Sequence, residues 1–241
     1  MRGIILKKAY LIFLLALLIQ LGCSGPKPKD ASMSPEMKNI QELLSKGNYD
    51  DALKAAKDIA VQVPPSPAAA NALYLEGYIL TFDKSDLQNA RPPLRKLLED
   101  YPQSAYVIPS QKLIADAQYW QGHYGGAIEE YRKLETMGNS KLGLYAKLQI
   151  GNSLLLEDKV DEALACYREL MEKNPGTTIA DSAQLMTANA YLKLQNASQA
   201  KKELKKLILQ SQNHDIQESA QKALRQIEED ASFGQDSQIS N

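Results

Sequence analysis

Five alanines recur along the chain at nearly constant intervals. They are Ala52, Ala90, Ala127, Ala163 and Ala200, and they lie 38, 37, 36 and 37 residues apart. A period of about 20 to 50 residues is typical of an array of repeated supersecondary units. One such unit cannot bury its apolar face alone, so the sequence predicts a stack of similar units rather than an irregular globule.

The residues that follow each alanine predict a helix. Apolar side chains stand four and seven positions later, which is the spacing of one helix face. These pairs are Ala56 and Ile59, Leu94 and Leu97, Tyr131 and Leu134, Tyr167 and Leu170, and Leu204 and Leu207. Clusters of β-branched residues are few and turn residues come at regular intervals, so we expect an all-α fold with these positions in its core.

A second signal predicts a partner helix before each of these helices. A small residue and a large one stand three apart at Gly77 and Leu80, Gly151 and Leu154, and Ala188 and Tyr191, which allows paired helices to cross closely. Proline at positions 64, 102 and 175 ends three of the second helices.

The pattern Gly-x-Tyr-x-x-Ala, followed by an aromatic residue and a terminal proline, resembles the tetratricopeptide repeat. The resemblance covers residues 35 to about 212 and implies a right-handed solenoid of five helix pairs. A last amphipathic helix, from Ile216 to about Glu229, would cap the array with a polar outer face. We therefore expect one repeat domain over residues 35–230 and a disordered tail over residues 231–241.

The first 22 residues have the features of a secretory signal. Arg2, Lys7 and Lys8 precede an apolar run from Ala9 to Leu21, and the segment contains no acid. The run is 13 residues long, whereas a helix that spans a bilayer needs about 20. We expect residues 1–22 to be removed on export.

Leu21-Gly22-Cys23-Ser24 resembles the lipobox of bacterial lipoproteins, although Gln20 stands where an aliphatic residue is usual. The resemblance implies acyl chains on Cys23, which would anchor the protein in a membrane. Because Ser24 rather than Asp follows the cysteine, likeness to enteric lipoproteins implies the periplasmic face of the outer membrane. Residues 23–34 would form a flexible tether. The alternative is a plain secreted protein with a stray cysteine.

Charge and cysteine content exclude some classes of partner and bond. Without the signal, 25 Lys and Arg stand against 29 Asp and Glu, and the sequence shows no basic stripe, so nucleic acid is not the expected partner. Once Cys23 is lipidated, Cys166 is the only free thiol, which leaves no internal disulfide.

The sequence offers no catalytic constellation. His123 and His214 have no partner at metal-ligand spacing, and no glycine-rich phosphate loop or nucleophile turn is present. Cys166 has no histidine near it in the sequence and is expected to be inert. We therefore expect a binding scaffold, with no catalytic or metal-binding residues and no cofactor.

The segment Glu99-Asp100-Tyr101-Pro102-Gln103-Ser104-Ala105-Tyr106 looks like a junction of periplasmic lipoproteins of the BamD type, which help to assemble outer membrane proteins. The resemblance implies an adaptor whose partners are envelope proteins, including a β-barrel assembly machine. The same residues also fit a plain helix stop and cap. The alternative functions are a coordinator of cell-wall synthesis or of the Tol-Pal system, or another envelope scaffold.

Tetratricopeptide arrays bind partners in a groove that their first helices line. The repeat register places the following residues on that side: Tyr74, Tyr78, Tyr119, Trp120, Tyr145, Asn152 and Asn189. We expect an aromatic strip around Trp120, with the two asparagines bonding to a partner's backbone. Packing in the core is the competing interpretation for each of them.

Overall fold

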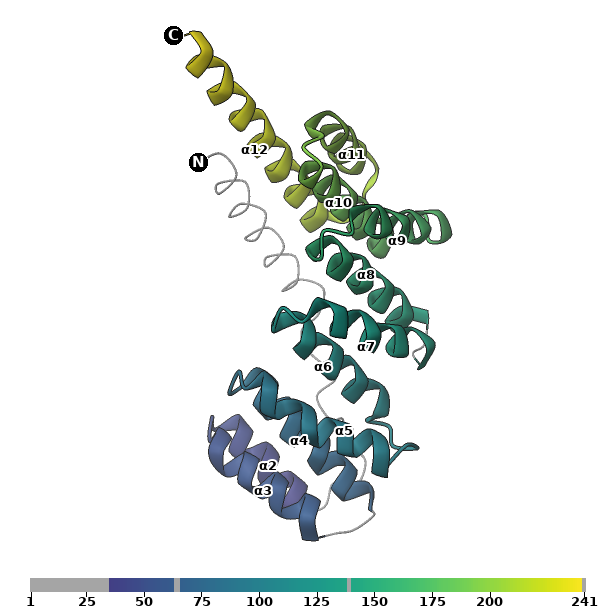
Figure 1. Cartoon of the computed structure of the whole chain (residues 1–241). Helices are drawn as coiled ribbons and strands as arrows, with labels where there is room; N and C mark the ends of the chain where they lie inside the picture. Colours follow the sequence, from purple (N-terminus) through teal and green to yellow (C-terminus); the bar gives the residue numbers. More distant parts are fainter. Residues whose placement is uncertain (1–34, 63–65, 138–139, 240–241) are drawn as a thin grey trace. The chain divides into compact units, whose positions relative to one another are not determined.

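The computed structural model describes residues 35–62, 66–137 and 140–239, and every regular element in these ranges is an α-helix (Figure 1). The first helices of the pairs are α2 (Pro35–Ser45), α4 (Pro67–Phe82), α6 (Val107–Trp120), α8 (Ser140–Leu156) and α10 (Thr178–Lys193). The second helices are α3 (Tyr49–Gln62), α5 (Leu87–Asp100), α7 (Tyr124–Met137), α9 (Val160–Lys173) and α11 (Ala197–Gln210). A last helix, α12 (His214–Ile239), follows. The predicted fold of five helix pairs and a C-terminal capping helix is confirmed.

The repeat seen in the sequence corresponds to a repeated helix. Each second helix is 14 residues long, and each of the five alanines is its fourth residue. All five alanines have 0% exposed surface, and the residues four and seven positions later are buried as well. A methyl group at the fourth position therefore lets each second helix lie close against its neighbours.

The turn inside each pair has a residue in the left-handed backbone region, two positions before the second helix begins. These residues are Gly47, Ser85, Gly122, Asp158 and Gln195, with φ between 54° and 78°. In the first turn the N–H of Asn48 donates to the Leu43 carbonyl at 2.9 Å, which closes the helix end. Glycine adopts this conformation freely, whereas a side chain at the same position is strained.

The chain divides into two compact units, and the boundary falls after Ala117, inside α6. In the first unit α3 packs between α2 and α4, and α4 packs on α5. Its core has two clusters, one around Ile40 and Ile79 and one around Tyr74 and Leu94. The sequence predicted one domain over residues 35–230. A repeat contacts mainly its neighbours, so an array has no single core to hold it together.

In the second unit, α8 packs on α7 and α9, and α10 packs on α8, α9, α11 and α12. The capping helix α12 buries Ile216, Ala220, Ala223 and Ile227, which follow a helical spacing on one face. It continues to Ile239, into the segment where the sequence predicted a disordered tail from residue 231.

The predicted signal, the lipidated Cys23 and the tether lie outside the described residues. Among the residues that are described, no helix is both long and apolar enough to cross a membrane.

Candidate functional site

Four of the seven residues predicted to line a groove are buried. Tyr74 is 0% exposed, Asn152 and Asn189 are each 4% exposed, and Tyr119 is 5% exposed. A partner cannot reach these side chains in the folded units. We predicted that these four side chains would form a binding surface, and for them this prediction is corrected. They pack in the core, which was the competing interpretation.

Tyr74 lies on α4 in the core of the first unit. Its ring stacks on Tyr106 with centroids 4.9 Å apart and an interplanar angle of 22°. Its hydroxyl has no hydrogen-bond partner among the described residues, and burial raises the pKa of the phenol well above its usual range. A buried hydroxyl without a partner costs about 1 to 3 kcal/mol, so the Tyr74 hydroxyl lowers the stability of the folded unit.

Asn152 belongs to a closed polar network in the second unit. Its Nδ2 donates to Gln149 Oε1 at 3.0 Å, and its Oδ1 accepts from the Tyr167 hydroxyl at 2.9 Å. Both hydrogen bonds are buried, so the Asn152 side chain links α8 to α9 and is not available to bind the backbone of a partner peptide. Asn189, at the same repeat position in α10, contacts Met186 Sδ at 3.8 Å.

The other three predicted residues are half-buried. Tyr78 lies between Tyr74 and Phe82 on α4, with ring centroids 6.2 and 4.7 Å away. Tyr145 on α8 meets Tyr131 edge-to-face at 6.2 Å. Trp120 is the last residue of α6 and falls in the second unit. The structure thus brings Tyr78 together with Tyr74, while Trp120 and Tyr145 belong to the other unit.

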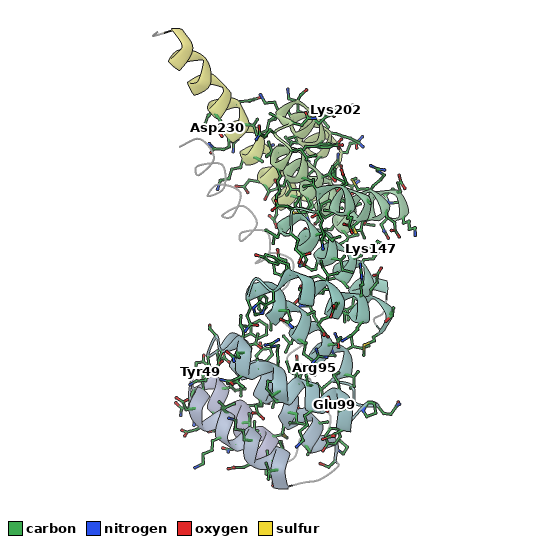
Figure 2. All side chains as sticks on the ribbon, in the orientation of Figure 1. Tyr49, Arg95, Glu99, Lys147, Lys202 and Asp230 are labelled. Atoms are coloured by element: carbon green, nitrogen blue, oxygen red, sulfur yellow. The ribbon has the colours of Figure 1, made fainter. Side chains whose placement is uncertain are left out.

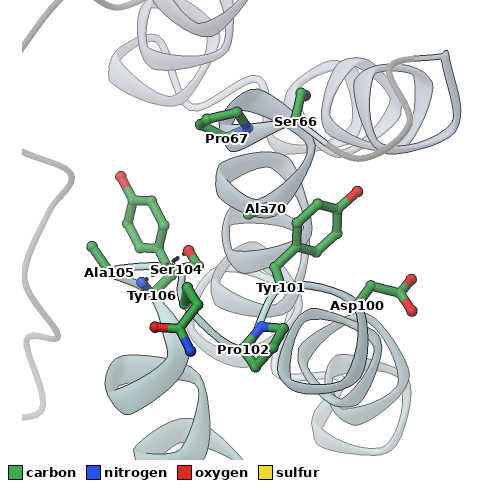
Figure 3. Close-up of a pocket in the computed structure, with 10 residues that line it drawn as sticks. Ser66, Pro67, Ala70, Asp100, Tyr101, Pro102, Ser104, Ala105 and Tyr106 are labelled. Atoms are coloured by element: carbon green, nitrogen blue, oxygen red, sulfur yellow. Dashed lines mark hydrogen bonds between the residues drawn. The ribbon is translucent and has the colours of Figure 1, made fainter.

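A hollow of about 520 Å³ opens in the first unit (Figure 3). One side is the start of α4, with Ser66, Pro67 and Ala70, and the other is the whole junction from Asp100 to Tyr106. Tyr101 and Tyr106 lie on opposite sides of Ala70, which is 1% exposed and forms part of the floor. The hollow is therefore an open, mostly apolar slot between two tyrosine rings.

Local hydrogen bonds hold this slot in shape. Ser66 caps α4 by accepting from the Ala69 N–H at 3.1 Å, and Pro67 takes the first helical position. Ser104 Oγ accepts from the Tyr106 N–H at 3.2 Å, which fixes the turn before α6. Because the Tyr106 ring stacks on the buried ring of Tyr74, this packing limits its movement.

The chemistry of the slot suits an inserted apolar side chain. Tyrosine supplies large, rigid contact area and is enriched among residues that dominate binding energies. Burial raises the pKa of Tyr106, so its hydroxyl stays protonated at neutral pH and can donate a hydrogen bond. Asp100 is exposed at the rim and adds a negative charge beside the opening.

Helical register does not reveal this site, because the site is built from a loop and a helix end. The sequence did single out the segment Glu99–Tyr106, but as a resemblance and as a helix boundary. The signal that would have found the slot is the pair Tyr101 and Tyr106 flanking a proline turn, facing the small residues at the start of α4.

The described residues hold no group of three or more His, Cys, Asp and Glu that could bind a metal ion. Burial raises the pKa of the half-buried Cys166 thiol, although the nearby Lys147 opposes the shift. A thiol whose pKa is raised is a poor nucleophile at neutral pH.

Comparisons with known proteins agree with this fold. A sequence model of the tetratricopeptide repeat matches residues 37–105, and a second matches residues 145–177 and 182–214. No curated protein sequence matches the chain at a significant level.

Solved structures of tetratricopeptide proteins share the architecture at low sequence identity. A structure of MamA is 18% identical with a TM-score of 0.59, and the match covers 75% of this chain and 96% of that one. MamA from Desulfovibrio magneticus is 15% identical with a TM-score of 0.58, over 73% and 96% of the two chains. YrrB, described as having an unusual peptide-binding site, is 19% identical with a TM-score of 0.55, over 79% and 92%. Identities this low establish the fold alone.

Proposed function

We propose that this chain, a tetratricopeptide-repeat protein, binds an extended segment of a partner protein through the slot between Tyr101 and Tyr106. The carrying observation is the slot itself, an open hollow of about 520 Å³ with two tyrosine walls and a small-residue floor. A peptide side chain that filled it would bury apolar area on both rings. The structural neighbour YrrB is described as a peptide-binding protein of the same fold, which supports the same class of ligand.

A binding role requires a shaped protein surface and no metal ion or reactive side chain. The described residues hold no cluster that could bind a metal ion, and burial raises the pKa of the half-buried Cys166 thiol. A scaffold of paired helices that presents a shaped surface needs neither. Protein partners are therefore the proposed ligands of this chain.

The finer proposal is a lipid-anchored scaffold of the bacterial envelope. Leu21-Gly22-Cys23-Ser24 after a short apolar run supports attachment through Cys23, at the periplasmic face of the outer membrane. The likeness of Glu99–Tyr106 to the BamD-type junction supports a role as an adaptor in outer membrane protein assembly. That segment is the one that forms the slot wall, so the likeness falls on the proposed binding surface.

The alternative proposal is a coordinator of cell-wall synthesis or of the Tol-Pal system. Crosslinking in intact cells, followed by purification of the chain, separates the two. Recovery of a barrel-assembly insertase supports the adaptor, and recovery of peptidoglycan synthases or Tol proteins supports the coordinator. Tyr101→Ala should reduce the yield of the true partner by at least tenfold, because loss of an interface tyrosine costs about 2 kcal/mol.

The anchor has its own test. Cys23→Ser should abolish incorporation of labelled fatty acid and release the protein from the membrane fraction. If the variant stays with membranes after a high-salt wash, the apolar run of residues 9–21 is an uncleaved anchor and the lipoprotein proposal is wrong.

A further inference from the structure

The outer face of α11 carries unpaired positive charge. Lys202, Lys205 and Lys206 are exposed and Lys201 is half-buried, and none of the four makes an ion pair or hydrogen bond with the described residues. The one acid of this helix, Glu203, is turned toward α10, where it accepts a hydrogen bond from Gln184 Nε2 at 3.2 Å. Figure 2 shows Lys202 at the outer side of α11.

A large apolar side chain lies among these lysines. Leu209 is 84% exposed, more than any other large hydrophobic residue that the structure describes as exposed. It follows Lys202, Lys205 and Lys206 by seven, four and three residues, so all four side chains share one helix face. We call this set the α11 face.

No other second helix in the described ranges has three exposed lysines around an exposed leucine. Three of their lysines have acidic partners: Lys57 lies 3.8 Å from Glu76, Lys133 lies 3.0 Å from Glu130, and Lys173 lies 2.8 Å from Glu169. At the repeat position of Leu209, α5, α7 and α9 have Glu99, Thr136 and Glu172. In α3 this position is Val61, which is 79% exposed, but Asp58 stands there at the repeat position of Lys206. The repeat itself therefore does not require a basic face around an exposed leucine.

We infer that the α11 face docks on an anionic phospholipid bilayer. Protein interfaces are enriched in Tyr, Trp and Arg and depleted in Lys, and α11 contains no aromatic residue and no arginine. Lysine is a flexible point charge that suits mobile headgroups, and each lysine near an anionic surface strengthens binding about fivefold. Leu209 would enter the boundary between headgroups and acyl chains.

The expectation that the chain has no basic stripe rested on its overall charge. The charge of the whole chain is close to balanced, and that balance hides four lysines against one acid in α11. The bilayer is the nearest polyanion if the proposed anchor at Cys23 holds the chain at a membrane, so the inference rests on that proposal for proximity. Lipid labelling of Cys23 tests the anchor, and protection of the α11 lysines tests the docking. Either result can be negative without the other.

The test measures how fast each lysine of the full-length chain is acetylated, by mass spectrometry, in the presence of vesicles. Vesicles of phosphatidylglycerol are compared with vesicles of phosphatidylcholine. We expect Lys202, Lys205 and Lys206 to react at least threefold more slowly on phosphatidylglycerol only. Lys54, which is exposed at the repeat position of Lys202 in α3, is the internal control and should react equally in both.

Salt completes the test. At about 1 M NaCl the Debye length falls to about 3 Å, so the protection should disappear. Equal rates on both vesicles, equal protection of Lys54, or protection that survives salt would each overturn the inference. So would lysines that stay reactive on vesicles but are shielded in intact cells, because a protein would then cover the α11 face.

Discussion

Two buried tyrosines, one in each unit, differ in how their hydroxyls are hydrogen-bonded. Tyr167 in the second unit donates to Asn152 Oδ1 at 2.9 Å, and Asn152 in turn donates to Gln149. Tyr74 in the first unit is as deeply buried, but its hydroxyl has no partner and its ring backs the tyrosine wall of an open slot. The Tyr167 hydroxyl thus has a buried partner, whereas the Tyr74 hydroxyl has none among the described residues and lies beside the surface that we propose binds a partner.

The largest expected effect concerns the helix contact under Tyr167. A Cβ at Gly151 would lie 2.6 Å from Tyr167 Cε1, and the hydrogen bond to Asn152 keeps that ring from moving aside. Gly151→Ala should therefore destabilise the fold by about 2 to 3 kcal/mol in a denaturant titration. Gly143→Ala, in the same helix, is the control, because its Cβ would meet only a backbone oxygen at 3.4 Å. Equal effects of the two substitutions would contradict the close contact.

The next effect concerns the network itself. Tyr167→Phe leaves Asn152 Oδ1 buried without its donor, which should cost about 1 to 3 kcal/mol. The ring and its packing stay, so the loss measures the hydrogen bond alone. Thermal unfolding of the purified chain checks it, and a variant that melts like the wild type would show that the network does not stabilise this unit.

The matched change in the first unit should have the opposite sign. Tyr74→Phe removes a hydroxyl that bonds to none of the residues the structure describes, so we expect no loss of stability and a gain of up to about 1 kcal/mol. The same thermal measurement applies. A loss as large as that of Tyr167→Phe would mean that the Tyr74 hydroxyl has a bonding partner, and the comparison of the units would fail.

The smallest effects are pH-dependent and also differ in sign. Burial raises the pKa of Glu76 above 4.5 in the first unit, whereas hydrogen bonds from Lys147 and Lys173 lower the pKa of Glu169 below 4.5 in the second. Ionised Glu76 therefore opposes folding at neutral pH, and this penalty fades as the pH falls through its folded pKa toward 4.5. Ionised Glu169 stabilises above 4.5, and that contribution is lost as the pH falls through its folded pKa.

Denaturant titrations of Glu76→Gln and Glu169→Gln from pH 7 to pH 3 check these signs. Glu76→Gln should be more stable than the wild type at pH 7, and Glu169→Gln less stable, each by less than about 1 kcal/mol. Both differences should vanish at the acid end. Curves with the same sign would show that the two carboxyls have similar environments.

The sequence predicted the repeat well because its signal is local. The alanine at the fourth position of each second helix and the apolar residues four and seven later are all buried as expected. The close approach at Gly77 could also be predicted, since a Cβ there would overlap Leu94 Cγ. Helical spacing alone determines such contacts within a pair.

The groove could not be predicted in the same way, because burial of a first helix depends on several neighbours. In α10 every residue from Ser182 to Ala190 is buried, since α8, α9, α11 and α12 all pack against this helix. Helical register assigns one face to solvent, and here no face of that stretch remains open. The slot in the first unit depends on a junction and a helix start that are far apart in sequence, which periodicity does not reveal.

The central claim is that partners bind at the junction slot of the first unit. A photo-crosslinking residue placed at Ala105, on the rim of the slot, tests it in intact cells. Thr178 is the matched position after the corresponding proline turn of the second unit, and it is exposed as well. We predict protein adducts at position 105 that are lost with Tyr101→Ala, and none at position 178. Adducts at position 178 alone, or adducts at position 105 that persist with Tyr101→Ala, would contradict the claim.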